Sequence, residues 1–238
     1  ISNKKLGSRE RHDVLPEHNE GMHVIPQILT NRADDFLEIE KQLYEYGYRE
    51  VNLNLGCPSG TVTAKGRGAG FLAYPEELSK FLDQIYSKTR MKISVKTRIG
   101  ISSEEEWPQL LTLFNHFPID HLIIHPRLLQ DFYKGYPHMD AYQYAKEHSL
   151  SPIFYNGDIH FVDEIKGGLG IQTKGVMLGR GLLMNPALAE EINHEMEEGV
   201  SEKRNVEKTL SSERLKKFHD AILDGYCEEM SGDRNVLF

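Results

Sequence analysis

Short runs of apolar and β-branched residues alternate along the chain with segments of helical period. The runs that predict strands are residues 23–29, 50–56, 92–99, 121–127, 152–156 and 175–181. Around Leu53, Val95 and Ile123 the runs show little alternation of polar and apolar positions, as expected of parallel strands buried on both faces. The pattern therefore predicts a sheet of about six strands.

The segments between the strands predict helices. Residues 35–46 and 75–86 carry apolar side chains three or four positions apart. Serines and glutamates in residues 102–106 form a capping box for a further helix, in which we expect Pro108 to cause a kink.

Repeated strand-helix units indicate either an open doubly wound sheet or a closed barrel, and six strands are too few to close the usual barrel of eight. The last two predicted strands end in glycine-containing turns, at residues 156–158 and 179–181. Loops after strands seven and eight of such a barrel commonly hold phosphate. We therefore predict an α/β fold, a (β/α)8 TIM barrel over residues 1–186, with two strands before Ile1 and both chain ends incomplete.

Residues 187–238 predict a small all-helical domain that is incomplete here. Asn185 and Pro186 suit the start of its first helix. A serine at 211 or 212 begins a second helix, with the apolar stripe Leu215, Phe218, Ile222 and Tyr226. Two helices with one apolar face each need a third helix to pack against. The charged residues 199–210 predict an exposed linker.

The composition is that of an ordinary soluble globular protein. The chain has 238 residues, 39% of them hydrophobic, and a net charge of 28 minus 36, or −8. No stretch reaches the roughly 20 apolar residues that cross a bilayer, and no segment resembles a secretion signal. Cys57 and Cys227 are too few for a disulfide scaffold or a paired-cysteine metal site, so we expect a cytoplasmic protein. The acidic balance argues against a general polyanion binder and leaves a local basic patch open.

Cys57 is the most informative single residue. It follows a predicted strand, at the end where barrel active sites are built. Free cysteines are most often packed in a core, but Gly56 and Pro58 fix a sharp turn here, and Asn54 places an amide in an otherwise apolar run. A thiol near its reference pKa of about 8.5 is mostly protonated at pH 7, so two roles stay open for Cys57, that of a general acid and that of a nucleophile.

Residues 63–72 form a glycine-rich segment with Lys65 and Arg67. The segment lacks the spacing of a P-loop or a dinucleotide fingerprint. A phosphate loop and a mobile loop that folds over the site are both open.

Further polar side chains lie near the ends of other predicted strands. A lysine inside a buried strand is unfavourable without a partner, so Lys96 predicts a nearby anion or electron-rich ring. His125 and Arg127 follow on the next strand, and Gln27 lies near the end of the first. Each alone suits a structural hydrogen bond, but their gathering at one barrel end favours a site.

These residues supply amides, a thiol, a lysine and a histidine, without a carboxylate cluster, metal motif or serine triad. The set suits a phosphorylated aromatic cofactor, and flavin mononucleotide (FMN) fits it. The FMN phosphate is expected at Gly157, Asp158, Gly179 and Arg180. Lys96 is expected to stabilise the negative charge of the reduced ring.

Five segments give the chain a family resemblance when they are taken in order: NLNLGCPSGTV, VKTRIG, HPR, NGDI and GVMLGRG. From about Val24 to Pro186 the chain resembles the tRNA-dihydrouridine synthases, and its tail is similar to their C-terminal helical domain. The N-terminal strand motif of that family, which contacts the flavin, is absent from these residues.

The resemblance implies an FMN enzyme that reduces a uridine of tRNA to 5,6-dihydrouridine, with NADPH as reductant. Hydride from reduced FMN adds to C6 of the uracil, and Cys57 matches the cysteine that protonates C5. The positions that match cofactor contacts are Gln27, Lys96, His125, Asn156, Gly157, Asp158, Gly179 and Arg180. Asn54 and Arg127 match positions around the flavin and the uracil, and we assign both to the substrate.

The target base has to leave its stack, and contacts to the tRNA backbone offset that cost. We assign Lys65 and Arg67 to tRNA. Further candidates, which also suit a solvated charged face, are Lys4, Lys5, Arg9, Arg11, Arg214, Lys216 and Lys217. We expect a monomer with tRNA and NADPH as partners and no membrane contact.

Two other functions stay open. One is an FMN barrel that acts on a free pyrimidine, in the manner of dihydroorotate dehydrogenases, although appended helices argue against it. The other is a barrel that binds RNA or phosphate without catalysis.

Overall fold

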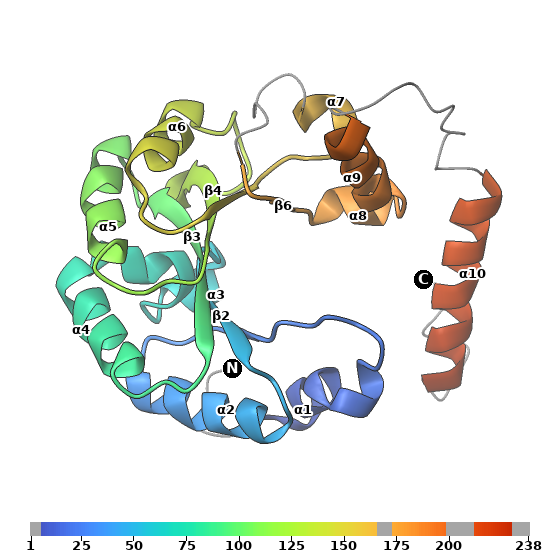
Figure 1. The fold of residues 1–238 in the computed structure, drawn as a ribbon, viewed down its shortest axis with the longest axis horizontal. Coiled ribbons are helices and arrows are strands. Elements are labelled where there is room, and N and C mark those ends of the chain that lie inside the picture. Colours follow the sequence, from blue (N-terminus) through green and yellow to red (C-terminus); the bar gives the residue numbers. More distant parts are fainter. Residues whose placement is uncertain (1–5, 166–172, 199–211, 230–238) are drawn as a thin grey trace. The chain divides into compact units, whose positions relative to one another are not determined.

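The computed structural model in Figure 1 describes residues 6–165, 173–198 and 212–229. The chain divides into two compact units, the first made of residues 1–157 and 173–177 and the second of residues 158–172 and 178–238. The predicted linker and the apolar end of the chain lie outside the described residues. The division into a barrel and a helical domain at residue 186 stays a prediction.

The first unit is built on a parallel sheet whose six strands lie in chain order. The strands are β1 (Gln27–Ile28), β2 (Glu50–Leu55), β3 (Lys92–Gly100), β4 (Leu122–Leu128), β5 (Ile153–Asn156) and β6 (Val176–Met177). All six predicted strands are confirmed, although β1 and β6 have only two residues each. The α/β class is thereby confirmed, whereas closure into an eight-stranded barrel stays a prediction.

Helices cover one face of this sheet (Figure 1). They are α2 (Ala33–Glu45), α4 (Pro75–Tyr86), α5 (Trp107–Phe114) and α6 (Met139–His148), and consecutive ones pack against each other. Phe36, Leu82 and Trp107 are fully buried, because each helix turns its apolar stripe toward the strands. The pattern predicted α2, α4 and α5, but not α6 or the short α1 (Ser8–Val14).

The capping box before α5 is confirmed, and the expected kink at Pro108 was wrong. Ser103 Oγ accepts a hydrogen bond from the Glu105 amide, and the Glu106 carboxylate accepts from the Ser103 amide at 2.9 Å. Helix α5 begins at Trp107, so Pro108 lies in its first turn, where no helical hydrogen bond to its nitrogen is needed.

The strands alternate more strictly than the sequence suggested. In β2 and β3 the residues Leu53 and Val95 pair with each other, and the polar pairs Asn52 with Ser94 and Asn54 with Lys96 flank them. Successive side chains of a strand point to opposite faces, so β2 and β3 present an apolar face and a polar face. The polar face carries the candidate site.

The second unit contains the helices α7 (Val162–Glu164), α8 (Arg180–Met184), α9 (Leu188–Glu198) and α10 (Ser212–Glu229). The Asn185 side chain accepts a hydrogen bond from the Ala187 amide at 2.9 Å, which satisfies one donor at the start of α9. In α10, Leu215, Ile222 and Tyr226 are all more than a third exposed. None of the helices in the described ranges is long and apolar enough to cross a membrane.

Candidate active site

A chain of side-chain hydrogen bonds crosses the polar face from β3 to β1. Ser94 Oγ accepts from Asn52 Nδ2 at 3.0 Å, and Asn52 Oδ1 accepts from Gln27 Nε2 at 2.7 Å. Gln27 Oε1 in turn accepts from Asn54 Nδ2 at 2.6 Å. Each amide donates in the same direction, so the buried end at Ser94 fixes the orientation of Gln27 and Asn54.

The same network shapes the turn that carries Cys57. Asn54 Oδ1 accepts hydrogen bonds from the backbone amides of Gly56 and Cys57, both at 3.0 Å. Cys57 is partly exposed and forms no disulfide. Asn54 therefore has a second task beside its predicted substrate contact, because it holds the thiol-bearing turn in place.

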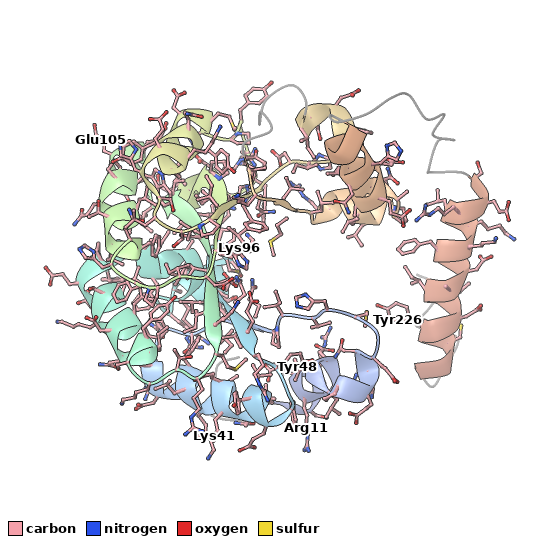
Figure 2. The ribbon with its side chains drawn as sticks, viewed as in Figure 1. Arg11, Lys41, Tyr48, Lys96, Glu105 and Tyr226 are labelled. Atoms are coloured by element: carbon pink, nitrogen blue, oxygen red, sulfur yellow. The ribbon has the colours of Figure 1, made fainter. Side chains whose placement is uncertain are left out.

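Lys96 lies beside Asn54 in the register of the sheet, on the face of β3 away from α4 and α5 (Figure 2). Burial, together with the positive charge of Arg98, lowers the pKa of Lys96 to about 8, and interaction with Cys57 raises it. Within the described part of the chain, no hydrogen bond or ion pair reaches its ammonium group. A half-buried cation of this kind is a candidate functional group, because its partial desolvation without a partner is unfavourable for folding.

Arg98 is fully buried, and its guanidinium donates hydrogen bonds to three backbone carbonyls. It donates to Gly56 O at 3.2 Å, to Leu128 O at 2.7 Å and to Phe132 O at 2.5 Å. These bonds connect the ends of β2, β3 and β4. Arg98 is therefore a structural cation beside the site.

His125 and Arg127 lie next to each other on β4 and are buried. Arg127 Nη1 is 3.2 Å from His125 Nε2, so His125 accepts there when Arg127 donates. Arg127 also donates to Lys134 O and to Gly135 O, in the loop after β4. The predicted substrate contact of Arg127 stays a prediction, and the structure adds a role in holding that loop.

Gly157 packs directly against His125. Its φ is +142°, and a Cβ atom there would lie 3.0 Å from His125 Cδ2. Asn156, at the end of β5, donates from Nδ2 to Met177 O at 2.8 Å and so connects β5 to β6. Both residues belong to the first unit, together with Gln27, Asn54, Cys57, Lys96, His125 and Arg127.

The remaining predicted phosphate contacts, Asp158, Gly179 and Arg180, belong to the second unit. Arg180 Nη2 forms an ion pair with Asp158 Oδ1 at 2.9 Å. Gly179 precedes α8 and is exposed. Phosphate binding by these three residues stays a prediction.

The glycine-rich segment after Cys57 contains two short helical turns, and both of its predicted roles, phosphate loop and mobile loop, stay predictions. It forms α3 (Gly60–Thr63) and η2 (Gly68–Ala73), and residues 68–72 are buried. Gly68 has a φ of +56°, and a Cβ there would lie 2.7 Å from Cys57 O. Lys65 is exposed and Arg67 half-buried, and both connect to Asn31 through hydrogen bonds.

The other basic candidates for tRNA contacts differ in setting. Lys4 and Lys5 lie outside the described residues, and Arg9 and Arg11 are exposed on α1. On α10, three candidates pair with carboxylates: Arg214 with Glu190, Lys216 with Asp220, and Lys217 with Glu213.

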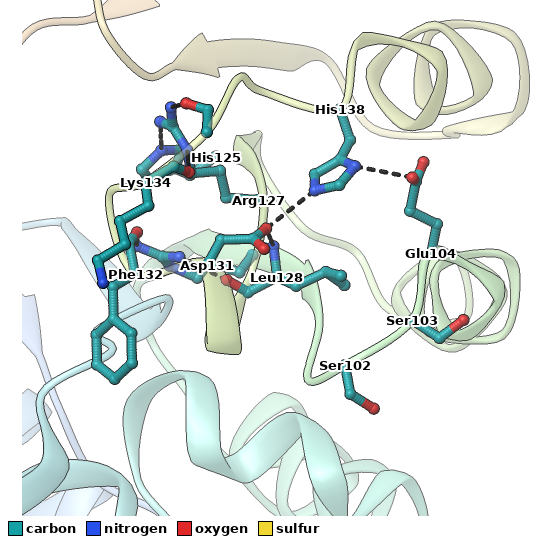
Figure 3. Close-up of polar contacts among 12 residues, drawn as sticks. Ser102, Ser103, Glu104, His125, Arg127, Leu128, Asp131, Phe132, Lys134 and His138 are labelled. Carbon is teal, nitrogen blue, oxygen red and sulfur yellow. Dashed lines mark hydrogen bonds and ion pairs between the residues drawn. The ribbon is translucent and has the colours of Figure 1, made fainter.

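Sequence reasoning missed Asn52, Ser94 and His138. His138 Nδ1 is 2.7 Å from Glu104 Oε1, and its Nε2 is 2.9 Å from Asp131 Oδ2 (Figure 3). The repeat of polar residues at every second position of β2 and β3 was a signal for the first two. No local pattern indicates His138, because Glu104 lies in another loop and only the folded path of its own loop brings Asp131 to it.

The fold and the candidate site together are typical of α/β enzymes that are built on a parallel sheet. Thiol, amide, ammonium and imidazole groups gather on the polar face of a parallel α/β sheet, toward the carboxyl ends of its strands, where barrel and open-sheet enzymes bind their ligands. The chain belongs to the dihydrouridine synthase family: the model described as "Dihydrouridine synthase (Dus)" matches residues 3–231.

Curated relatives agree with this assignment. A "Probable tRNA-dihydrouridine synthase" of Staphylococcus aureus is 30% identical over 192 residues, which cover 71% of this chain and 57% of the relative. "tRNA-dihydrouridine synthase B" of Pasteurella multocida is 27% identical over 201 residues, with coverages of 81% and 60%. The chain thus spans 57 to 60% of the length of these relatives.

Among solved structures, that of morphinone reductase in complex with tetrahydroNAD matches with a TM-score of 0.46 and 13% identity. The match covers 74% of this chain and 51% of the other. A similarity at this level supports no inference about the site.

Proposed function

We propose that the protein reduces a uridine of tRNA to 5,6-dihydrouridine, with FMN as its flavin and NADPH as the reductant. One observation carries the proposal: in a member of the dihydrouridine synthase family, the half-buried Lys96 ammonium lies near the Cys57 turn without a hydrogen bond or ion pair in the described chain. The names of the relatives supply tRNA as the substrate class.

The residues of the site fit a flavin. Lys96 offers a positive charge that has no ion pair or hydrogen bond among the described residues, and Gln27 offers an amide whose orientation is fixed. We assign the flavin contacts to these two residues and His125, and the phosphate contacts to Asn156, Gly157, Asp158, Gly179 and Arg180. Bound and reduced, FMN supplies the hydride that adds to C6 of uracil.

The side chains of this chain supply the remaining chemistry. The Sγ atom of Cys57 donates the proton that C5 of uracil takes up. Asn54 orients the uracil while its own carbonyl oxygen fixes the Cys57 turn. The Lys96 ammonium, half-buried on the polar face, favours negative charge that develops near it.

The architecture belongs to the proposal as well. The six strands are the third to eighth of a (β/α)8 barrel over residues 1–186, and residues 187–238 begin a helical domain that binds tRNA. Lys65, Arg67 and Arg127 contact the substrate. The working form is a monomer.

An absorbance experiment tests this function. We expect the purified protein to bind FMN, NADPH to bleach the flavin under anaerobic conditions, and unmodified tRNA to restore its colour. Recovery with orotate in place of tRNA would instead indicate an enzyme of free pyrimidines. A protein that binds tRNA but cannot take up FMN would be an RNA-binding module.

The variant Cys57→Ala tests the proton donor. We expect it to retain FMN and bleaching by NADPH, but to lose dihydrouridine formation by about 100-fold or more, the usual contribution of a positioned acid. Cys57→Ser is the matched control for size. Unchanged turnover in Cys57→Ala would contradict the assignment.

A further inference from the structure

The loop between β4 and α6 displays aromatic side chains beside the site. Phe132, Tyr133 and Tyr136 are 49%, 56% and 93% exposed, and Lys134 lies between them in the sequence. A tyrosine ring that is almost fully exposed gains little from packing within its own chain. We call Phe132, Tyr133, Lys134 and Tyr136 the aromatic loop face.

Buried arginines hold the backbone of this loop. Arg98 donates to Phe132 O, and Arg127 donates to Lys134 O at 3.2 Å and Gly135 O at 2.6 Å. Phe132 has a φ of +52°, a conformation that a bulky residue rarely adopts unless its surroundings impose it. The loop is therefore ordered before any partner binds.

Two acidic side chains near this loop, those of Asp131 and Glu104, already have partners. Asp131 accepts from the Leu128 amide at 2.7 Å and contacts His138, whose other ring nitrogen contacts Glu104 (Figure 3). In the part of the chain that the structure describes, the Lys134 ammonium has no hydrogen bond or ion pair. The aromatic loop face thus combines three rings with one uncompensated positive charge.

The loop is also connected to the candidate site. Arg127, which holds it, is 3.2 Å from His125 Nε2, and the Tyr133 ring centroid is 6.3 Å from that of His125. A base that enters the site leaves its neighbours without a stacking partner. Aromatic side chains replace such partners for any base, and a lysine attracts the adjoining phosphates.

We propose that the aromatic loop face stacks the unpaired RNA bases that flank the target uridine, with Tyr136 as the outer ring and Lys134 on a phosphate. This inference rests on the proposed function, because it places the flanking nucleotides around the same site. It adds a role for the first unit in tRNA binding that is independent of the helical tail.

The test compares Tyr136→Ala with Tyr136→Phe, which keeps the ring. Stacking on one aromatic side chain corresponds to about a fivefold to hundredfold change in affinity. We expect Tyr136→Ala to raise the Kd for unmodified tRNA and its KM by that factor, with kcat at saturating tRNA unchanged. Tyr136→Phe and Leu150→Ala, a change at an 81% exposed residue that precedes β5, should match the unmodified protein.

The outcomes separate this inference from the proposed function. If the protein forms dihydrouridine and Tyr136→Ala binds tRNA as tightly as the parent, the stacking role is wrong. If the protein forms no dihydrouridine but loses tRNA affinity only in Tyr136→Ala, the stacking role holds and the enzyme assignment is wrong. If Tyr136→Phe loses affinity as fully as Tyr136→Ala, the hydroxyl and not the ring makes the contact, which overturns the inference.

Discussion

Replacing Lys96 by methionine should stabilise the protein while it removes function. Methionine keeps the length of the side chain and removes its charge. Burial lowers the pKa of Lys96 to about 8 from an ordinary value of 10.5, and this difference corresponds to about 3 kcal/mol. Lys96→Met should therefore raise the free energy of unfolding at pH 7 by up to about 3 kcal/mol.

The dependence on pH identifies the cause. Because the folded-state pKa lies below the unfolded value, the unfolded chain binds the proton more tightly between about pH 8 and 10.5. The penalty is complete below pH 8 and disappears as the pH rises through that window. The advantage of Lys96→Met should thus fall to about 2 kcal/mol at pH 9 and below about 1 kcal/mol at pH 10.

Urea denaturation of the flavin-free protein at pH 7, 8, 9 and 10 measures these differences. Lys80→Met, at an exposed position of α4, is the matched control and should change stability by less than about 0.5 kcal/mol at every pH. Lys96→Met should also bind FMN more weakly. A variant that is less stable than the parent, or whose advantage does not vary with pH, would refute the assignment of Lys96 as a half-buried cation without a partner.

Three further predictions concern the support of the site. Ser94→Ala removes the acceptor of the Asn52 amide and should lower stability by about 1 to 2 kcal/mol in urea denaturation, whereas Ser94→Thr should retain most of it. Gly157→Ala places a Cβ against His125 and should lower stability by about 1 to 3 kcal/mol and weaken FMN binding, which fluorescence titration measures. Burial lowers the pKa of His138, but hydrogen bonds to Asp131 and Glu104 outweigh it and raise the pKa above its usual 6.5. The stability that the charged His138 contributes is therefore complete below about pH 6.5 and is lost as the pH rises through the folded-state pKa. Over that pH range, the urea midpoint of His138→Gln should fall less than that of the parent protein.

Much of the fold followed from the sequence because the parallel strands are short apolar runs between amphipathic segments. All six were found, and the boundaries of β2 agreed to within one residue. The face of each strand was harder to assign. Asn52 and Asn54, like Ser94 and Lys96, repeat at every second position, and only the register showed that they meet across strands.

The sequence indicated candidate residues where the local setting is unusual, as at Cys57 and Lys96, and their roles stay predictions. The hydrogen bonds of Arg98 and Arg127 could not be predicted, because their acceptors are backbone carbonyls of other segments that only the tertiary structure brings close. The aromatic loop face was missed for the same reason. Exposure of Tyr136 is a property of the folded loop, although the run of aromatic residues around Lys134 was visible in the sequence.

The measurement that tests the central claim most directly is mass spectrometry of the RNA product. Unmodified tRNA is incubated with the protein, FMN and NADPH, digested to nucleosides and analysed for uridine that has gained two hydrogens. We expect the protein to reduce one or a few uridines of tRNA and Cys57→Ala to leave them unchanged. Unreduced tRNA after incubation with a flavin-loaded protein whose flavin NADPH bleaches would contradict this expectation.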